Sequence, residues 1–198
     1  MAPFVSGVDT LPPIASLVAD WMEPENRKSF PIFQTAALSY AKRGWRVFPV
    51  NHDKRPITSH GRTDATTDPK QIETWGKRFP SALVAIATGE ESGVVALDID
   101  VTESINGFDS LEEIAGPFHP TTPTAHTPRG GCHLLFQHPG HFVKTVAGRL
   151  GPGLDIRGDG GSLTLPPRPG GAWDEHLGLD CKIACNNDPL RGGFRVQF

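Results

Sequence analysis

The spacing of apolar residues changes from a helical to a strand period several times along the chain. Residues 30–44 predict a helix, because apolar side chains recur every three or four positions and Gly44 follows as a stop. Residues 45–50 then predict a strand. The apolar positions of the predicted helix are Phe33, Ala36, Ala37, Tyr40 and Ala41.

A second helix is predicted over residues 68–79 from its capping residues and from one apolar face. Asp68 suits the N-cap, Pro69 suits the first helical position, and Gln71 completes a capping box. The apolar face consists of Ile72, Trp75 and Phe79. A third capped helix is predicted over residues 107–116.

Apolar runs predict strands at residues 82–89, 94–100 and 132–136, and a glycine-rich run leads to a further strand region at 154–167. The stretches between these elements, including the polar residues 51–68, are predicted as loops. Helices alternate with strands early in the chain, and the later strands cluster. This order predicts an α/β or α+β domain.

The bulk composition fits one soluble globular domain. The chain has 198 residues, of which 37% are hydrophobic and 21% are charged. With a net charge of −3, the chain needs a local basic patch to hold nucleic acid. No apolar run reaches the roughly 20 residues that span a bilayer, and we find no signal peptide. Its three cysteines do not form a disulfide framework, so we expect a cytoplasmic protein without membrane contact.

The strand predicted at 94–100 ends in two carboxylates. Asp98 and Asp100 are two positions apart, so both project from one face of the strand while Leu97 and Ile99 enter the core. Carboxylates held this close repel each other, and a divalent cation between them removes the repulsion. The alternative is a strand that ends at Asp98 and leaves Asp100 in a solvated turn.

A second group of candidates lies at the start of the strand predicted at 132–136. The adjacent Gly130 and Gly131 allow a ligand to approach the backbone, and their N–H groups can hold phosphate oxygens. Arg129 adds a positive charge, and His133 is placed to contact a phosphate or to transfer a proton. A single histidine beside a turn is more often structural.

The third group lies in the glycine-rich stretch that begins at residue 153. Asp155 and Arg157 share one strand face, where they can form an ordinary surface ion pair of small energetic value. The functional interpretation makes Asp155 a third metal-binding carboxylate and Arg157 a nucleotide contact. Asp159 is expected to serve the turn itself.

Three strand-borne acids, a histidine and basic residues beside glycines suit two-metal phosphoryl or nucleotidyl transfer. In that chemistry one metal lowers the pKa of an attacking hydroxyl, and the other neutralises the leaving pyrophosphate. A metal-dependent nuclease also uses clustered carboxylates and is a further hypothesis. Triphosphate binding fits the histidine and Arg157 better.

The order of these motifs resembles the bifunctional DNA primase/polymerase domain of the archaeo-eukaryotic primase superfamily, which is frequent in phage and plasmid replication proteins. The similarity extends from about Phe30 to Pro167. It implies an α/β (α+β) fold with an RRM-like palm and an added N-terminal α/β unit. It also implies the synthesis of RNA or DNA primers on a single-stranded DNA template from nucleoside triphosphates, with Mg²⁺ or Mn²⁺ as cofactor.

The resemblance also assigns roles to individual positions. The family's catalytic positions correspond to Asp98, Asp100, Asp155 and His133, with the three acids as metal ligands. Its basic positions near the nucleotide or template correspond to Lys54 and Arg157. The basic residues of loop 54–62, with Lys77 and Arg78, are candidates for a template-facing patch.

The chain departs from the family pattern in two places. Where the family usually reads Pro-Pro-Ser, this chain has Pro166, Pro167 and Arg168. Residues 174–198 match nothing expected there, and a helicase is expected to be a separate protein and not fused as in many relatives. A decayed copy that keeps the fold and binds nucleic acid or nucleotides without turnover is therefore the second hypothesis.

The predicted organisation has three parts. Residues 1–29 are expected to be a poorly ordered lead-in, residues 30–170 the catalytic domain, and residues 171–198 a divergent tail, which a truncation would explain. Cys181 and Cys185 lie in that tail without a second pair of ligands at zinc-finger spacing. They are interpreted as incidental cysteines.

Overall fold

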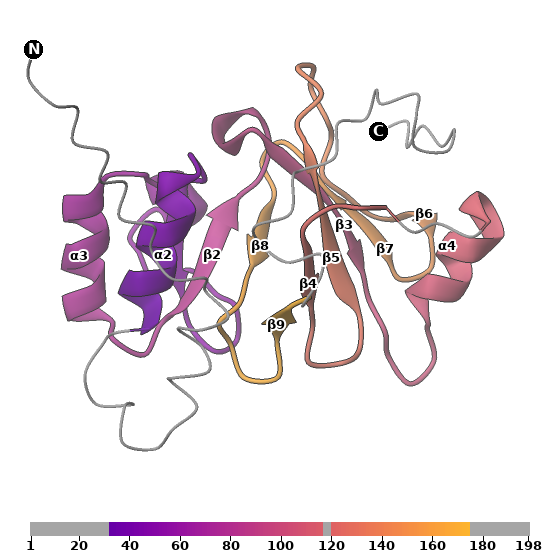
Figure 1. Cartoon of the computed structure of the whole chain (residues 1–198), viewed down its shortest axis with the longest axis horizontal. Helices are drawn as coiled ribbons and strands as arrows, with labels where there is room; N and C mark the ends of the chain where they lie inside the picture. The colour runs from indigo at the N-terminus through magenta and orange to yellow at the C-terminus, as the bar shows by residue number, and fades with distance from the viewer. Residues whose placement is uncertain (1–31, 117–119, 175–198) are drawn as a thin grey trace, which may run out of the picture.

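The protein folds as an α+β domain in a computed structural model that describes residues 32–116 and 120–174 (Figure 1). The predicted lead-in lies outside these residues, as do Cys181 and Cys185, which were interpreted as incidental. Three α-helices are present in the described part, and their order follows the prediction. They are α2 (Ile32–Lys42), α3 (Pro69–Arg78) and α4 (Gly107–Ala115).

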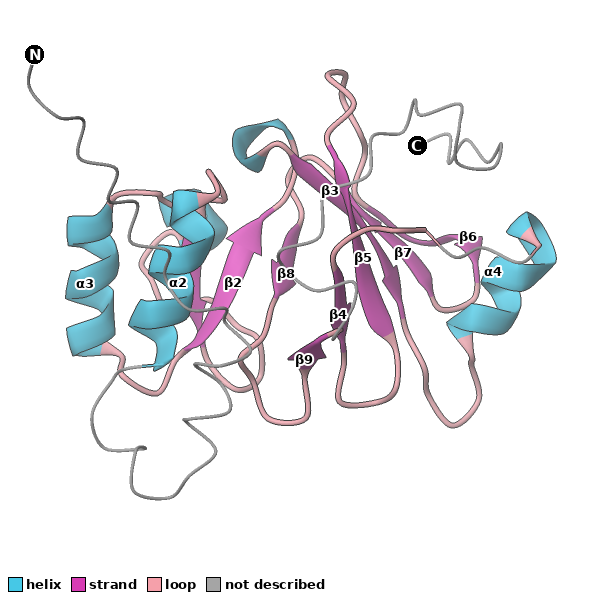
Figure 2. Cartoon of the chain, viewed as in Figure 1, coloured by secondary structure: helices cyan, strands magenta, loops and turns pink. Residues whose placement is uncertain are grey.

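Two antiparallel sheets form the body of the domain (Figure 2). The smaller sheet has the order β1-β2-β8, with β1 at Val47–Val50, β2 at Leu83–Ala87 and β8 at Ser162–Thr164. The larger sheet has the order β6-β7-β3-β5-β4-β9. Its strands are β3 (Val94–Ile99), β4 (Thr124–His126), β5 (Cys132–Gln137), β6 (Val146–Gly151), β7 (Leu154–Arg157) and β9 (Ala172–Trp173).

The two sheets share one core. Helices α2 and α3 pack against each other, and α2 also packs on the smaller sheet. Side chains from these elements meet one face of the larger sheet, represented by Ala96 of β3 and Leu135 of β5. The opposite face of the larger sheet is covered by α4 through Leu111. In Figure 1 the order is therefore helices, smaller sheet, larger sheet and α4.

The capping of α3 confirms one prediction and corrects another. The Asp68 side chain accepts a hydrogen bond from the Lys70 N–H at 3.1 Å, as expected of an N-cap. The predicted capping box with Gln71 is wrong, because the Asp68 N–H donates instead to Thr66 Oγ1 at 3.0 Å.

Three strands occur where the sequence predicts loops or a tail. β4 has only three residues, and β6 is an exposed edge strand with an irregular register against β7. β9 lies within the predicted tail, yet it pairs with β4. In addition, Trp173 donates a hydrogen bond from its indole to the Tyr40 hydroxyl at 3.0 Å. Such short or edge strands form because neighbouring strands supply their partners, which local spacing does not reveal.

No helix in the described part of the chain has both the length and the apolar character needed to cross a membrane.

Candidate active site

The candidate residues form one row across the larger sheet. Asp98 of β3 is in register with Asp155 of β7 on one side and with His133 of β5 on the other. Residues in register on neighbouring strands point to the same face of a sheet. Three residues that are distant in sequence are therefore brought side by side, as the interpretation of these motifs requires.

The face on which this row lies follows from strand alternation. Leu97 and Ile99 point into the core beneath α4, and Ala96 points into the core shared with the smaller sheet. Asp98, two positions after Ala96, continues on that second face. The predicted separation of the carboxylate from its apolar neighbours is confirmed, and the site opens on the side where the smaller sheet packs.

Asp100 lies just beyond the end of β3, and two glycines fix its backbone. Its N–H donates to the Gly153 carbonyl at 2.8 Å, and its carbonyl accepts from the Gly107 N–H at 2.9 Å. A Cβ atom on Gly107 would lie 2.4 Å from the Gly153 carbonyl oxygen, so the two segments can approach this closely only because residue 107 is a glycine. This packing holds Asp100 beside Asp98 although the strand has already ended.

Arg157 joins two of the acids. Its Nη2 atom lies 2.8 Å from Asp98 Oδ2 and 2.8 Å from Asp155 Oδ2, and its Nε donates to Asp98 Oδ2 at 3.1 Å. The guanidinium thus neutralises carboxylates that would otherwise repel each other. The expected pair of Asp155 and Arg157 exists, but it extends to the buried Asp98 and is more than a surface ion pair.

The electrostatics of Asp98 reflect these neighbours. Its side chain is buried, and burial alone would raise the pKa of the carboxyl. The contact with His133 and the charge of Arg157 outweigh burial and lower the pKa from 3.8 to about 2. Asp98 is therefore fully ionised at neutral pH and available to a cation.

Two buried polar atoms in the row lack a hydrogen-bond partner in the described structure, Asp98 Oδ1 and His133 Nδ1. His133 Nε2 lies 3.2 Å from Asp98 Oδ1, and this contact contributes to the lowered pKa of the Asp98 carboxyl. Buried polar atoms are normally paired, and an unpaired carboxylate oxygen is the kind of atom that a bound cation would satisfy.

The carboxylates fit a divalent metal. One oxygen from each of Asp98, Asp100 and Asp155 lies within 4.8 Å of the other two. Carboxylate oxygens are preferred ligands of Mg²⁺ and Mn²⁺. Together with the unpaired Oδ1 of Asp98, this geometry supports a metal site at the end of β3.

Gly130 and Gly131 have structural roles beside the site. The Gly130 N–H donates to the Thr127 carbonyl at 3.0 Å, so the turn already uses this donor. Gly131 permits close contact with β3, because a Cβ atom there would lie 2.1 Å from the Ile99 carbonyl oxygen. The predicted phosphate contact of their N–H groups therefore stays a prediction for Gly131 and is disfavoured for Gly130.

The two glycines provide a direct test of this packing. Gly131→Ala should lower the free energy of unfolding by about 3 kcal/mol, because the clash is with backbone that cannot rotate away. Gly130→Ala should cost only about 1 kcal/mol, because Gly130 has open space around it and the strain comes only from its φ of +85°. Urea unfolding of both variants gives the two values. Equal losses would contradict the close approach at Gly131.

Basic residues approach the acids from turns outside the row. Arg129 contacts Asp100, with Nη2 to Oδ1 at 3.3 Å. Lys54 lies in a turn closed by Asn51, whose carbonyl accepts the Lys54 N–H at 2.9 Å. The charges of Asp98 and Asp100 act on Lys54, so the loop places this lysine near the acids as the resemblance implies.

One basic residue was missed among the candidates. Arg168 is only 8% exposed, and the charges of Asp98 and Asp100 act on it. The signal in the sequence was the replacement of the usual serine by arginine after Pro167, which we interpreted only as a departure. In the fold, that departure puts a cation beside the predicted metal ligands.

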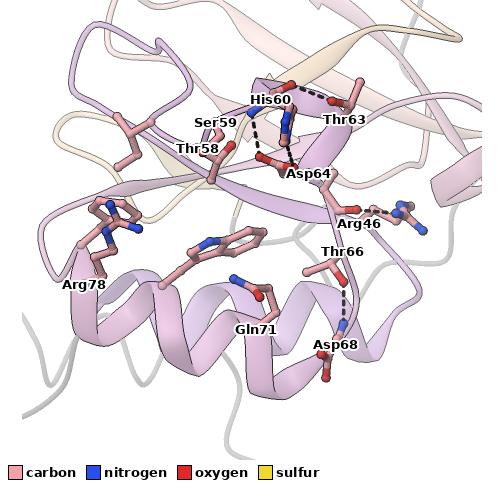
Figure 3. A pocket seen from close by; sticks show the side chains of 14 residues that line it. Arg46, Thr58, Ser59, His60, Thr63, Asp64, Thr66, Asp68, Gln71 and Arg78 are labelled. Carbon is pink, nitrogen blue, oxygen red and sulfur yellow. Dashed lines mark hydrogen bonds and ion pairs between the residues drawn. The ribbon is translucent and has the colours of Figure 1, made fainter.

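The remaining candidates lie elsewhere. A polar pocket of about 610 Å³ lies between loop 57–68 and α3, and Figure 3 shows Arg46, His60, Asp64 and Arg78 around it. Asp98, Asp100 and Asp155 do not line this pocket, and neither do the predicted nucleotide-binding residues. In the predicted template-facing patch, Arg62 is already paired with Glu91.

Asp159 serves its turn, as predicted. Its carboxylate accepts backbone N–H groups of Glu90 at 3.0 Å and Val143 at 2.7 Å, and it also contacts His138. These bonds hold the pKa of Asp159 below its ordinary value against the opposing effect of burial. The residue ties three loops together and is not a fourth member of the acidic cluster.

Comparison with known proteins now adds to this geometry. The family model described as bifunctional DNA primase/polymerase, N-terminal, matches residues 37–176, and this range includes every acid and base discussed above. A search of functionally characterised proteins finds no significant match. The match covers well over half of the chain, and the antiparallel α+β fold agrees with it. The chain therefore belongs to the bifunctional DNA primase/polymerase family, which implies a DNA primase/polymerase nucleotidyltransferase.

Proposed function

We propose that this protein extends primers, or starts them, by template-directed nucleotidyl transfer with two divalent metal ions. The observation that supports the proposal best is the row formed by Asp155, Asp98 and His133, with Asp100 beside it. Asp98 Oδ1 adds further support, because it is buried and has no hydrogen bond among the described residues.

The metal ligands in this proposal are Asp98, Asp100 and Asp155. Mg²⁺ or Mn²⁺ held there would supply Lewis-acid activation of the attacking hydroxyl and neutralisation of the leaving pyrophosphate. The chain's own residues have complementary tasks. The backbone contacts of Asp100 with Gly107 and Gly153 hold that carboxylate in place before any ligand arrives.

His133 and the basic residues would bind the nucleotide. His133 is 4% exposed, and its Nδ1 has no hydrogen-bond partner among the described residues, so the Nδ1–H of a protonated imidazole would be available to a phosphate oxygen. Lys54 and Arg129 enter from neighbouring turns and would place positive charge near the triphosphate. In the metal-free protein Arg157 is bound to Asp98 and Asp155. Metal ions that neutralise these two carboxylates would release the arginine to contact the nucleotide.

The template in this proposal is single-stranded DNA, with duplex regions opened by a separate helicase, in replication of the phage or plasmid type. The chain is weakly acidic overall, with a net charge of −3, so the template must follow local positive charge. The exposed Lys77 and Arg78 at the end of α3 are candidates for that contact.

The proposal is tested by incubating the protein with single-stranded DNA, labelled nucleoside triphosphates and Mg²⁺ or Mn²⁺. We expect labelled products that lengthen with time and that disappear when EDTA removes the metal. Shortening of labelled template would instead indicate a nuclease. Nucleotide binding without product would support the hypothesis of a decayed binding module.

A double variant, Asp98→Ala with Asp100→Ala, serves as the control for contaminating polymerases. Its circular dichroism spectrum must match that of the wild type, since Asp98 is buried in a charged network. Products that persist in the folded double variant would contradict the assignment of these acids as metal ligands.

A further inference from the structure

Arg168 is held in a defined turn between β8 and β9. The Gly171 N–H donates to the Arg168 carbonyl at 3.0 Å, and a Cβ on Gly171 would lie 2.7 Å from Arg168 Cγ and Nε. Gly170 packs against Pro128, the residue before Arg129. The turn with Arg168 therefore rests on the turn that presents Arg129 to Asp100, and the arginine stem is packed.

The Arg168 guanidinium is buried, and its charge is not paired within the part of the chain that the structure describes. The side chain is 8% exposed, and its Nε has no hydrogen-bond partner in the described structure. Within residues 32–116 and 120–174, no carboxylate forms an ion pair with it. An arginine cannot lose its proton at physiological pH, so its burial is unfavourable unless an anion joins it.

Lys54 is a second cation without a carboxylate in ion-pair contact in the described part of the chain. It adopts φ of 62°, a left-handed conformation that is uncommon for a lysine, in the turn where Asn51 Oδ1 accepts the N–H groups of Asp53 and Arg55. Burial, followed by the charge of Arg168, lowers the pKa of Lys54. The two cations therefore lie near each other and repel, which a polyanion between them would relieve.

The residues around Arg168 and Lys54 limit the kind of anion that would bind between them. Asp98 and Asp100 are close enough to act on both cations, so an anion bound there lies next to the proposed metal ligands. Arg129 already contacts Asp100, and His133 offers an unpaired Nδ1 on the same sheet face. A ligand with several linked negative groups fits this set better than a single carboxylate.

We propose that Arg168, together with Lys54, binds the polyphosphate chain of the incoming nucleoside triphosphate, and that this contact persists without divalent metal. The inference rests on the proposed function and adds a nucleotide-binding residue that the family's Pro-Pro-Ser pattern does not provide. The arginine presents a planar, bidentate donor on a packed stem, so it can bind two oxygens of a polyphosphate at once, which a serine hydroxyl at this position cannot do.

The test measures inorganic triphosphate binding by calorimetry in EDTA, which removes metal from the measurement. Arg168→Met keeps most of the packed stem and removes the guanidinium. We expect this variant to bind triphosphate roughly tenfold to a hundredfold more weakly than the wild type. Arg168→Lys should recover part of the affinity. Arg43→Gln, at an exposed arginine after α2, should bind like the wild type.

A thermal melt without ligand separates a binding role from a structural one. Removing an unpaired buried charge should leave the melting temperature of Arg168→Met unchanged or higher. Unchanged triphosphate affinity in Arg168→Met, or a lower melting temperature as its only effect, would overturn the inference. In either case primer synthesis by the wild type would leave the proposed function intact.

The opposite result is also distinguishable. If the wild type makes no primers in the assay above but loses triphosphate binding on Arg168→Met, the polymerase proposal fails and the anion site stands. The protein would then be a nucleotide-binding member of its family.

Discussion

Replacing Asp98 by asparagine is expected to lower the rate of primer synthesis roughly 10³-fold, because one ligand to the metals and one negative charge are lost while the side-chain volume stays the same. The effect should fall on the catalytic rate. Template binding, measured by fluorescence anisotropy with labelled single-stranded DNA, should change little. The rate is measured as labelled product formed per enzyme at saturating nucleotide.

The stability of the Asp98→Asn variant must be measured in parallel. The carboxyl has a pKa of about 2 in place of 3.8, so its ionised form stabilises the fold by on the order of 2 kcal/mol, and asparagine loses this contribution. Arg157 keeps its bond to Asp155, which limits the loss. Glu113→Gln, at an exposed carboxylate on α4, is the matched control and should retain both rate and stability.

A folded Asp98→Asn enzyme with nearly full activity would contradict metal binding at this position. If Asp98→Asn does not fold, Asp155→Asn tests metal binding at the same site. Asp155 is partly exposed and anchored by the Gly148 N–H at 2.9 Å. Its loss should perturb the fold less and still reduce catalysis.

Much of this site could be predicted from sequence because it lies on regular strands. Alternation alone places Asp98 opposite Leu97, and Asp155 on the same face as Arg157. Helical periodicity and a glycine stop similarly predicted α2, and capping residues predicted the start of α3. These features depend on residues one to four positions apart, where local geometry is nearly fixed by secondary structure.

The pairing of one strand with another could not be predicted from the sequence pattern alone. The register that sets Asp98 against both His133 and Asp155 depends on the pairing of β3 with β5 and β7. Without the resemblance, spacing in the sequence gives no measure of those pairings. β6 and β9 were missed for the same reason, since their partners supply most of what stabilises them.

Arg168 shows a different limit of sequence analysis. A change from serine to arginine after two prolines reads as a loss of pattern when only the motif is considered. In the fold, the turn packs the arginine stem and buries its guanidinium near Asp98 and Asp100. The meaning of the substitution depends on this environment, which local sequence cannot supply.

The role of Arg157 also emerges only in three dimensions. It bridges Asp98 and Asp155 and so occupies the position of a cation between the proposed metal ligands. Metal binding must therefore compete with this guanidinium, and nucleotide binding is favoured once the arginine is released.

Arg157→Gln is expected to lower the free energy of unfolding by about 3 kcal/mol at pH 7 in EDTA, because two neighbouring carboxylates, one of them buried, lose their shared cation. Mg²⁺ should stabilise this variant more than the wild type, since it no longer competes with the arginine. Arg129→Gln is the matched control. The ion pair between Arg129 and Asp100 is exposed, so its loss should lower the free energy of unfolding by less than about 1 kcal/mol.

The pH dependence of the difference identifies Asp98 as the cause. In the wild type the pKa of Asp98 is depressed from 3.8 to about 2, so its stabilising contribution is complete above pH 3.8 and is lost as pH falls through 2. Without Arg157 the pKa of Asp98 should rise from about 2 towards its ordinary value of 3.8, while the contact with His133 continues to lower it. The stability gap between the two proteins should therefore be largest near neutral pH and should shrink as the pH falls from about 4 to 2.

Urea unfolding at several pH values measures this gap directly. Other carboxylates with depressed pKa values, such as Asp159, are present in both proteins, so their contributions cancel in the difference. A gap that stays constant down to pH 2 would mean that Arg157 stabilises the fold through packing alone. A gap that closes in acid, and that Mg²⁺ narrows at pH 7, would establish that the arginine and the metal neutralise the same carboxylates.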